Sequence, residues 1–221
     1  MKQIFITIIL FLGITLAVDA QVINWRSLQI EKKNSVYLNL GYDYGMTAQL
    51  GYGRFFDIFK PIVLTADYSM PMGEDLFDDA KFRCGGQIEV FEKNRFSVSL
   101  KLLGNARKYE SDLVKIKNFG GEISVTSGYY KPTWHVAGEF GFDKSIVSLL
   151  EHKDLMKENY PDIKDGWYIP CGGNYFYGIQ ASKTFKKRFD ISTRIGGTNA
   201  ERNDENAMLP YYAQIGLIMR F

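Results

Sequence analysis

Two histidines are the side chains of this sequence best suited to proton transfer near neutral pH, and their neighbours determine what chemistry each could carry out. His135 precedes Glu139 by two steps along one face of a strand, so a carboxylate lies near the imidazole. A nucleophilic set also needs a serine in hydrogen-bond contact with the histidine, and the sequence places no serine beside His135. We therefore expect His135 to belong to a polar network and retain it only as a catalytic candidate.

His152 is the second catalytic candidate, and it stands beside Lys153 and Asp154 in a stretch with helical spacing. It could form a site together with Asp78 or Asp79, although nothing in the sequence requires that pairing. A solvated histidine on an exposed helix is the simpler interpretation.

Two acidic clusters could bind divalent cations, but their spacing fits no calcium-binding loop, so we expect solvated charge. They consist of Glu74, Asp75, Asp78 and Asp79, and of Glu201, Asp204 and Glu205. The sequence also contains no phosphate-binding loop, no metal motif built on paired cysteines and no dinucleotide fingerprint. We therefore expect no metal and no cofactor.

Cys84 and Cys171 are the two cysteines, and their spacing matches no metal site. In an exported protein they could form a disulfide, or they could be two buried thiols that behave as small hydrophobic groups. The sequence leaves both alternatives open.

The composition excludes several classes of protein. A formal net charge of +2 over 221 residues provides no basic arm for nucleic acid and no acidic tail. The 14 tyrosines, 16 phenylalanines and 21 glycines suit strands and tight turns better than helices.

The first 20 residues have the pattern of a secretory signal peptide. Lys2 provides the positive charge, residues 4–18 form the apolar run, and Val18-Asp19-Ala20 places a small residue at the cleavage site. We expect cleavage after Ala20, with an uncleaved anchor helix as the alternative. Residues 21–34 then form a periplasmic leader or a short strand, and residues 35–221 form the main domain.

Residues 210–221 show the pattern that characterises that domain, because apolar and polar side chains alternate up to the final Phe221. One face carries Tyr211, Ala213, Ile215, Leu217, Met219 and Phe221. Ten segments between Ser35 and Phe221 alternate in this way, which predicts an all-β protein. We predict a closed antiparallel up-and-down transmembrane β-barrel of about ten strands, with eight or twelve as alternatives.

Short and long connections alternate between these segments, as in barrels with short periplasmic turns and long outer loops. The longer connections cover residues 71–79, 108–118, 144–166 and 198–209. Within the third, Ser145 to Asn159 has approximately helical spacing, which predicts one short loop helix that ends before Pro161. Aromatic residues flank the short turns and predict an interfacial girdle of Phe56, Phe91, Phe96, Tyr130, Trp134, Phe185, Phe189 and Phe221.

Alternation alone does not say whether the apolar face points into the barrel or out of it. Charges of both signs occur deep within the predicted strands, where they could neutralise one another inside a barrel, and glycines favour the same polar face. We therefore expect the apolar face to contact lipid, with a soluble barrel as the alternative. The expected lumen network consists of Arg83, Glu89, Lys101, Glu122, His135, Glu139, Arg194 and Arg220.

These features together resemble the small outer-membrane β-barrel proteins of Gram-negative bacteria. The final strand ending in Phe221 is similar to the C-terminal signal that the barrel-assembly machinery recognises in this class. The resemblance implies an outer-membrane location and contact with outer-membrane lipid or lipopolysaccharide. It also implies the assembly machinery as a partner during insertion.

Three functions fit this resemblance. We expect a non-enzymatic barrel with a largely plugged lumen, whose outer loops bind a partner, a surface polymer or a ligand. The expected partners include a surface or periplasmic protein but no nucleic acid. The alternatives are a narrow solute-conducting pore and a lipid-modifying or proteolytic barrel enzyme. The candidate histidines argue against an enzyme that attacks outer-leaflet lipid, because His135 follows a short turn and so lies at the periplasmic end.

Overall fold

A computed structural model describes residues 22–28, 31–73, 78–169, 171–202, 207 and 209–221. The predicted signal peptide and the acidic residues at positions 74, 75, 204 and 205 lie outside these ranges. The described strands are β1 (Asn34–Tyr42), β2 (Met46–Asp57), β3 (Pro61–Pro71), β4 (Asp79–Lys93), β5 (Phe96–Glu110), β6 (Val114–Lys131), β7 (Trp134–His152), β8 (Gly166–Tyr168), β9 (Gly173–Phe185), β10 (Phe189–Ala200) and β11 (Tyr211–Arg220).

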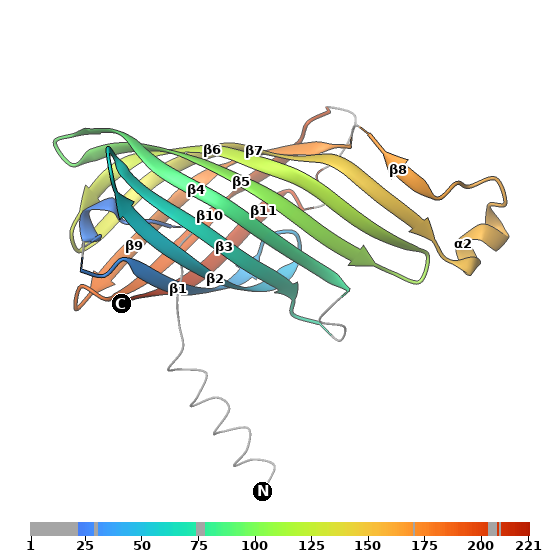
Figure 1. Ribbon diagram of the computed structural model, residues 1–221, viewed down its shortest axis with the longest axis horizontal. Coiled ribbons are helices and arrows are strands. Elements are labelled where there is room, and N and C mark those ends of the chain that lie inside the picture. The colour runs from blue at the N-terminus through green and yellow to red at the C-terminus, as the bar shows by residue number, and fades with distance from the viewer. Residues whose placement is uncertain (1–21, 29–30, 74–77, 170, 203–206, 208) are drawn as a thin grey trace, which may run out of the picture.

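Ten of these strands form a closed antiparallel barrel, which confirms the predicted fold (Figure 1). Each strand pairs with its neighbours in the chain, except that β7 pairs with β9 past the short strand β8, which pairs only with β7. The ring closes where β1 pairs with β11, from Ser35 opposite Arg220 to Tyr42 opposite Ala213. Closure leaves no unpaired edge within the barrel wall.

Side chains alternate between the two faces of the wall along each strand, and the apolar face points outward. In β11, Ile215 is 65% exposed, whereas Gln214 is 4% exposed and Arg220 is 3% exposed. The same arrangement, with apolar side chains exposed and polar ones buried, holds in β2, where Leu50 is exposed and Gln49 is buried. Charged and polar groups therefore fill the inside, and aliphatic and aromatic groups cover the outside.

The short turns that aromatic residues flank lie at one end of the barrel, and two of them use conformations that produce tight hairpins. Asn94 and Arg95 form the whole connection between β4 and β5, and both have positive φ values, 50° and 73°. This combination matches the two-residue turn whose twist suits antiparallel strands. Lys186 and Lys187, between β9 and β10, have similar φ values.

The opposite end is not built as the sequence pattern predicted. Residues 108–118 were predicted as a loop, but β5 runs to Glu110 and β6 begins at Val114, so the two strands meet in a tight turn. Strand β7 likewise continues to His152, pairing with β6 up to Val114. Strands β5, β6 and β7 therefore project beyond the rest of the barrel, with β8 and α2 (Asp154–Asn159) attached to them (Figure 1).

The predicted short helix is present, but its range was wrong. Residues 145–152 belong to β7, and only Asp154–Asn159 is helical. The cause is a bulge: Gly120 pairs with Ser145 but Phe119 pairs with Val147, so Ile146 is an extra residue. A bulge shifts the two-residue period by one, and the apolar residues around it then imitate helical spacing.

Candidate functional site

The interior of the barrel is the candidate site, because it contains nearly all of the buried charged groups. All eight residues of the expected lumen network have buried side chains, none of them more than 9% exposed. Their partners also include groups that the sequence analysis did not assign to the network, namely Arg26, Asp43, Asp67 and Asp190.

Arg83 is the centre of one cluster in the lumen. Asp67 faces it on β3, and Arg83 Nε donates to Asp67 Oδ1 over 2.9 Å. A carboxylate oxygen of Asp43 lies 3.7 Å from Arg83 Nη1. Tyr37 Oη donates to the other oxygen of Asp67 over 3.0 Å. A side chain at Gly51 would collide with the ring of Tyr37, so glycine at this position lets the ring lie across the lumen.

Asp43 belongs to the turn between β1 and β2, and its charge state follows from this cluster. Burial by itself would raise the pKa of its carboxyl, but the positive charges of Arg83, Lys81 and Arg194 outweigh burial and lower the pKa. Asp43 is therefore a carboxylate at neutral pH and adds a negative charge to the outer part of the lumen.

A second cluster joins strands on the other side of the barrel. Glu139 Oε1 accepts hydrogen bonds from Arg194 Nε and from Tyr212 Oη, each over 2.6 Å. The Arg194 guanidinium also stacks on the Tyr212 ring, 4.4 Å from its centroid. Lys101 and Glu122 form a further buried ion pair at 2.6 Å. Because buried charges are costly unless they are paired, these contacts keep a charged lumen stable.

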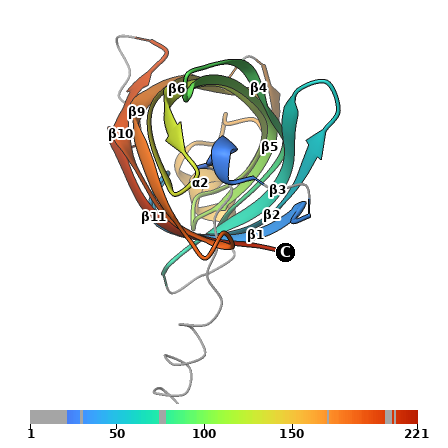
Figure 2. The ribbon, with the colours of Figure 1, turned by 90° about the vertical axis from the view of Figure 1, so that its left-hand side faces the viewer.

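The N-terminal segment closes the end of the lumen where the short turns lie. Residues 21–34 were expected to be a leader or a short strand, and the structure places a single 3-10 turn, η1 (Trp25–Ser27), inside the barrel (Figure 2). Trp25 is 4% exposed and packs with Ile23, Phe55, Val63 and Tyr130. We call residues 22–28 the plug.

Polar contacts tie the plug to strands on several sides of the barrel. Asn24 Nδ2 donates to the backbone oxygen of Lys131 over 3.0 Å and to Thr184 Oγ1 over 3.3 Å. Arg26 Nη2 donates to Glu89 Oε1 over 2.8 Å, and the backbone oxygen of Ser27 accepts from Arg220 Nη1 over 2.5 Å.

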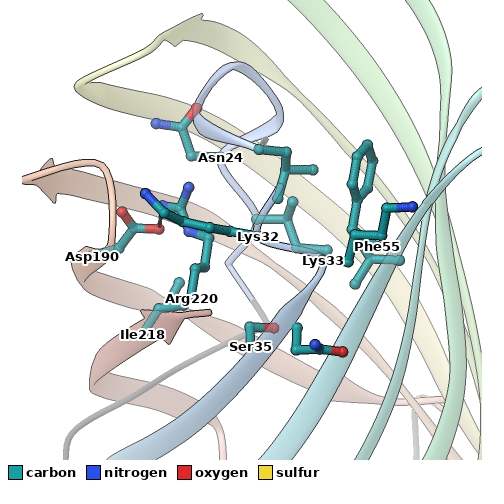
Figure 3. Close-up of a pocket in the computed structure, with 12 residues that line it drawn as sticks. Asn24, Lys32, Lys33, Ser35, Phe55, Asp190, Ile218 and Arg220 are labelled. Atoms are coloured by element: carbon teal, nitrogen blue, oxygen red, sulfur yellow. Dashed lines mark hydrogen bonds and ion pairs between the residues drawn. The ribbon is translucent and has the colours of Figure 1, made fainter. Parts of the chain in front are cut away.

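Arg220 also forms an ion pair with Asp190, so the last strand, β10 and the plug meet at one guanidinium (Figure 3). The pocket beside it is lined partly by the apolar side chains of Phe55 and Ile218. The plug thus packs against apolar side chains of the strands and is held in place by hydrogen bonds to charged groups.

His135 lies behind Tyr130, which packs against the plug, and it has a partner that the sequence analysis did not foresee. Ser182 faces it directly on β9, and Ser182 Oγ lies 2.8 Å from His135 Nδ1. Tyr130 stacks on the imidazole, with ring centroids 4.7 Å apart. The expectation that no serine lies beside His135 was wrong, because the register of β7 with β9 depends on a long connection. His135 is 0% exposed, and its Nε2 has no hydrogen-bond partner among the described residues.

The lumen widens at the end from which the long strands project. A polar cavity opens there, with four cationic and three acidic side chains in its lining. They are Lys81, Arg83, Arg107, Arg194, Asp43, Glu122 and Asp143. The cations are already paired: Lys81 contacts Asp143 over 2.8 Å, and Arg107 makes two hydrogen bonds of 2.6 Å to Asp79. The cavity is therefore a vestibule with nearly balanced charge at the end with the long strands, and the buried clusters form its floor.

His152 lies far from this floor and in a different environment from the one predicted. It ends β7 and is 8% exposed, so the expectation of a solvated helix position was wrong. Asp165, rather than Asp78 or Asp79, is its acidic partner: the carboxylate accepts from the His152 backbone N–H over 2.7 Å and lies 2.9 Å from Nδ1. Asp165 also accepts from Lys157 Nζ over 2.7 Å, which fixes α2 against the end of β7.

The predicted aromatic girdle lies beside the short turns, with one exception. Phe91, Phe96, Trp134, Phe185, Phe189 and Phe221 are exposed, and Phe56 is half-buried. Tyr130 was assigned to the girdle wrongly, because it faces inward and is 1% exposed. Its neighbour Tyr129 takes the outward position, with its ring centroid 5.8 Å from that of Trp134.

The two cysteines are free. The interpretation as two buried thiols was wrong, since Cys84 is exposed on the outer face of β4 and Cys171 is half-buried, with its thiol near Ser148 Oγ. In the described part of the chain, no three His, Cys, Asp or Glu side chains are grouped so that they could hold a metal ion.

A scan against protein-family models finds no match to this chain, and a search of curated proteins finds no similar sequence. Among the described helices, none is long and apolar enough to cross a membrane.

Proposed function

We propose that this chain is an outer-membrane β-barrel of a Gram-negative cell, exported by a signal peptide in residues 1–20. One observation carries the proposal: the barrel exposes its apolar side chains and buries its charges. Leu50, Leu102, Phe140 and Ile215 are each more than half exposed on the wall, whereas Arg83 and Glu89 are 2% exposed inside. A wall of this polarity would aggregate in water, but it matches the lipid-facing wall of a membrane barrel.

We further propose that the protein binds a partner at the cell surface and neither conducts solute nor catalyses a reaction. The plug fills the lumen at one end, and the Arg83 and Glu139 clusters together fill it farther along, where both line the floor of the polar cavity. The histidine nearest to a serine is completely buried, which argues against hydrolytic chemistry at that position.

The binding element in this proposal is the outer extension, which consists of the projecting ends of β5, β6 and β7 together with α2 and β8. Strand β6 has 18 residues, or roughly 60 Å of extended chain, and a tilt of about 40° gives a height of roughly 45 Å. An apolar membrane band is only about 25 Å tall, so much of the strand stands outside it. Exposed apolar side chains occur on the extension, including Trp167 and Ile169.

The membrane assignment is tested by refolding the chain that starts at Gln21 into detergent and then into liposomes. We expect a folded form whose electrophoretic mobility changes on heating, and flotation with the liposomes that resists alkaline carbonate. A chain that remains soluble and folded without detergent would refute the proposal. In planar bilayers we expect no discrete conductance, and stepwise currents would instead establish the pore alternative.

The binding role is tested by replacing residues 154–169 with a flexible glycine–serine linker of about ten residues. Such a linker can return from the end of β7 at His152 to the start of β9, where Gly173 faces Lys144, so the pairing of β6 with β7 can stay intact. We expect the variant to fold and insert like the parent protein but to lose adhesion of intact cells to surface partners. Unchanged adhesion would remove the extension from the proposed role. Turnover of lipid or peptide that disappears in His135→Ala or His152→Ala would restore the enzyme alternative.

A further inference from the structure

The outer wall carries an apolar groove over strands β3 to β6, outside the lumen. In register across the strands, Ala106 lies between Phe82 on β4 and Phe119 on β6, and Tyr68 on β3 faces Phe82. The small side chains of Ala106 and Ala80 leave a depression between the aromatic rings. Phe82 and Phe119 are each more than 40% exposed, so these rings remain accessible from outside.

Two lysines border this groove on the side of the outer extension. Lys108 follows Ala106 by two residues on the same face of β5, and it lies directly opposite Lys117 on β6. Side chains at directly opposite positions are about 5 Å apart at Cβ, and like charges there are destabilising. The pair therefore creates a place where an anion between the two strands would be stabilised.

The existing partners of these lysines are exchangeable. Lys108 Nζ lies 2.9 Å from Glu110, and Lys117 Nζ lies 3.4 Å from Glu151, with both lysine side chains about 40% exposed. Exposed ion pairs contribute little to stability, so a doubly charged phosphate can compete for the ammonium groups. Each of these glutamates is shared between two lysines, Glu110 between Lys108 and Lys153 and Glu151 between Lys115 and Lys117.

We infer that this groove binds a phosphate-bearing glycolipid of the outer leaflet, with an acyl chain between Phe82 and Phe119 and the phosphate between Lys108 and Lys117. This inference rests on the proposed membrane location and adds a specific lipid site to it. The order of groups supports it, since the apolar depression lies toward the membrane band and the lysines lie toward the outer surface. The two ammonium groups match the phosphate of such a lipid, and the apolar depression matches its acyl chain.

Native mass spectrometry of the refolded chain in detergent tests this site, with bisphosphorylated lipid A as the probe and the same lipid after removal of its phosphates as the comparison. We expect the phosphorylated form to bind more tightly, and Lys108→Gln/Lys117→Gln to weaken it by about tenfold or more. Lys183→Gln/Lys187→Gln removes the same charge near the short turns, and we expect unchanged binding. Ala106→Phe fills the depression without changing charge, and we expect it to weaken both forms of the lipid.

Equal binding of the two lipid forms, or equal binding by the Lys108→Gln/Lys117→Gln variant and the parent, would overturn the phosphate site. Unchanged binding by Ala106→Phe would overturn the acyl slot. Each variant is first checked for heat-modifiable mobility and liposome flotation. A parent protein that fails to insert would refute the membrane proposal itself, whereas a parent protein that inserts but does not distinguish the lipids refutes only the lipid site.

Discussion

Removing the indole of Trp25 should release the plug while the barrel remains closed. Trp25 is 4% exposed in the apolar cluster with Ile23, Phe55 and Tyr130, and its indole N–H has no hydrogen-bond partner among the described residues. Its contribution is therefore packing alone. Truncating a buried tryptophan to alanine costs about 3–5 kcal/mol, and each 1.4 kcal/mol is tenfold in an equilibrium constant.

The plug is not part of the ring of paired strands, so most of this loss should appear as undocking of the plug. The undocked population should then rise by a factor of roughly one hundred to several thousand. Hydrogen exchange measured by mass spectrometry reports this directly, because the Ser27 N–H bonds to Asn24 O over 3.0 Å when the plug is docked. We expect fast exchange in residues 22–28 of Trp25→Ala and unchanged protection in β1 to β11.

Trp167→Ala is the matched control, because Trp167 is 59% exposed on the outer extension. We expect it to leave exchange of the plug unchanged. The reasoning would be refuted if Trp25→Ala kept the plug protected, or if it lowered protection in the strands and in the plug equally. The second result would mean that the plug and the barrel unfold as one unit.

Two further perturbations test the lumen and the outer extension. Glu139→Gln removes a charge partner of the buried Arg194 and should lower the free energy of unfolding in detergent by about 3 kcal/mol or more, measured by denaturant titration. Glu151→Gln, at an exposed pair, should cost less than about 1 kcal/mol, and equal losses would contradict a charge-stabilised lumen. At Asp165, hydrogen bonds from the His152 backbone N–H and then from Lys157 lower the pKa of the carboxyl. Because the pKa of Asp165 is lower in the folded protein than in the unfolded chain, its ionised carboxylate stabilises the fold above the unfolded pKa. This stabilisation is lost only as the pH falls through the pKa of the folded protein. Residues 153–169 should therefore resist limited proteolysis from about pH 8 down to about pH 4. Asp165→Asn should be cleaved faster throughout this range, and equal cleavage rates would remove Asp165 as the anchor of α2.

The sequence was sufficient for the strand content, the number of strands in the barrel and the polarity of most positions along each strand. These properties follow from a two-residue period, which is a local feature of extended chain. The final strand illustrates this, since each predicted outward residue from Tyr211 to Met219 is more exposed than its inward neighbours.

Local periodicity could not reveal positions where that period is broken. The bulge at Ile146 made a strand resemble a helix, and the bulge between Glu89 and Phe91 leaves both Val90 and Phe91 exposed. Tyr130 was misassigned for a different reason: it was placed by its position beside a turn, although the unbroken alternation of β6 through Ile123 and Val125 puts it on the inner face.

Contacts across the lumen depended on the closed tertiary structure. His135 and Ser182 are 47 residues apart, and Arg220 meets the backbone of Ser27 across 193 residues. Asp67 and Asp190 lie on the polar faces that the alternation predicts, so the alternation could have added them to the predicted network. Nothing in the sequence near Arg26 indicates that this residue enters the barrel. The sequence by itself determined which side chains face inward. The register of the strands and the closure of the ring decided which of them meet, because both depend on pairings between distant parts of the chain.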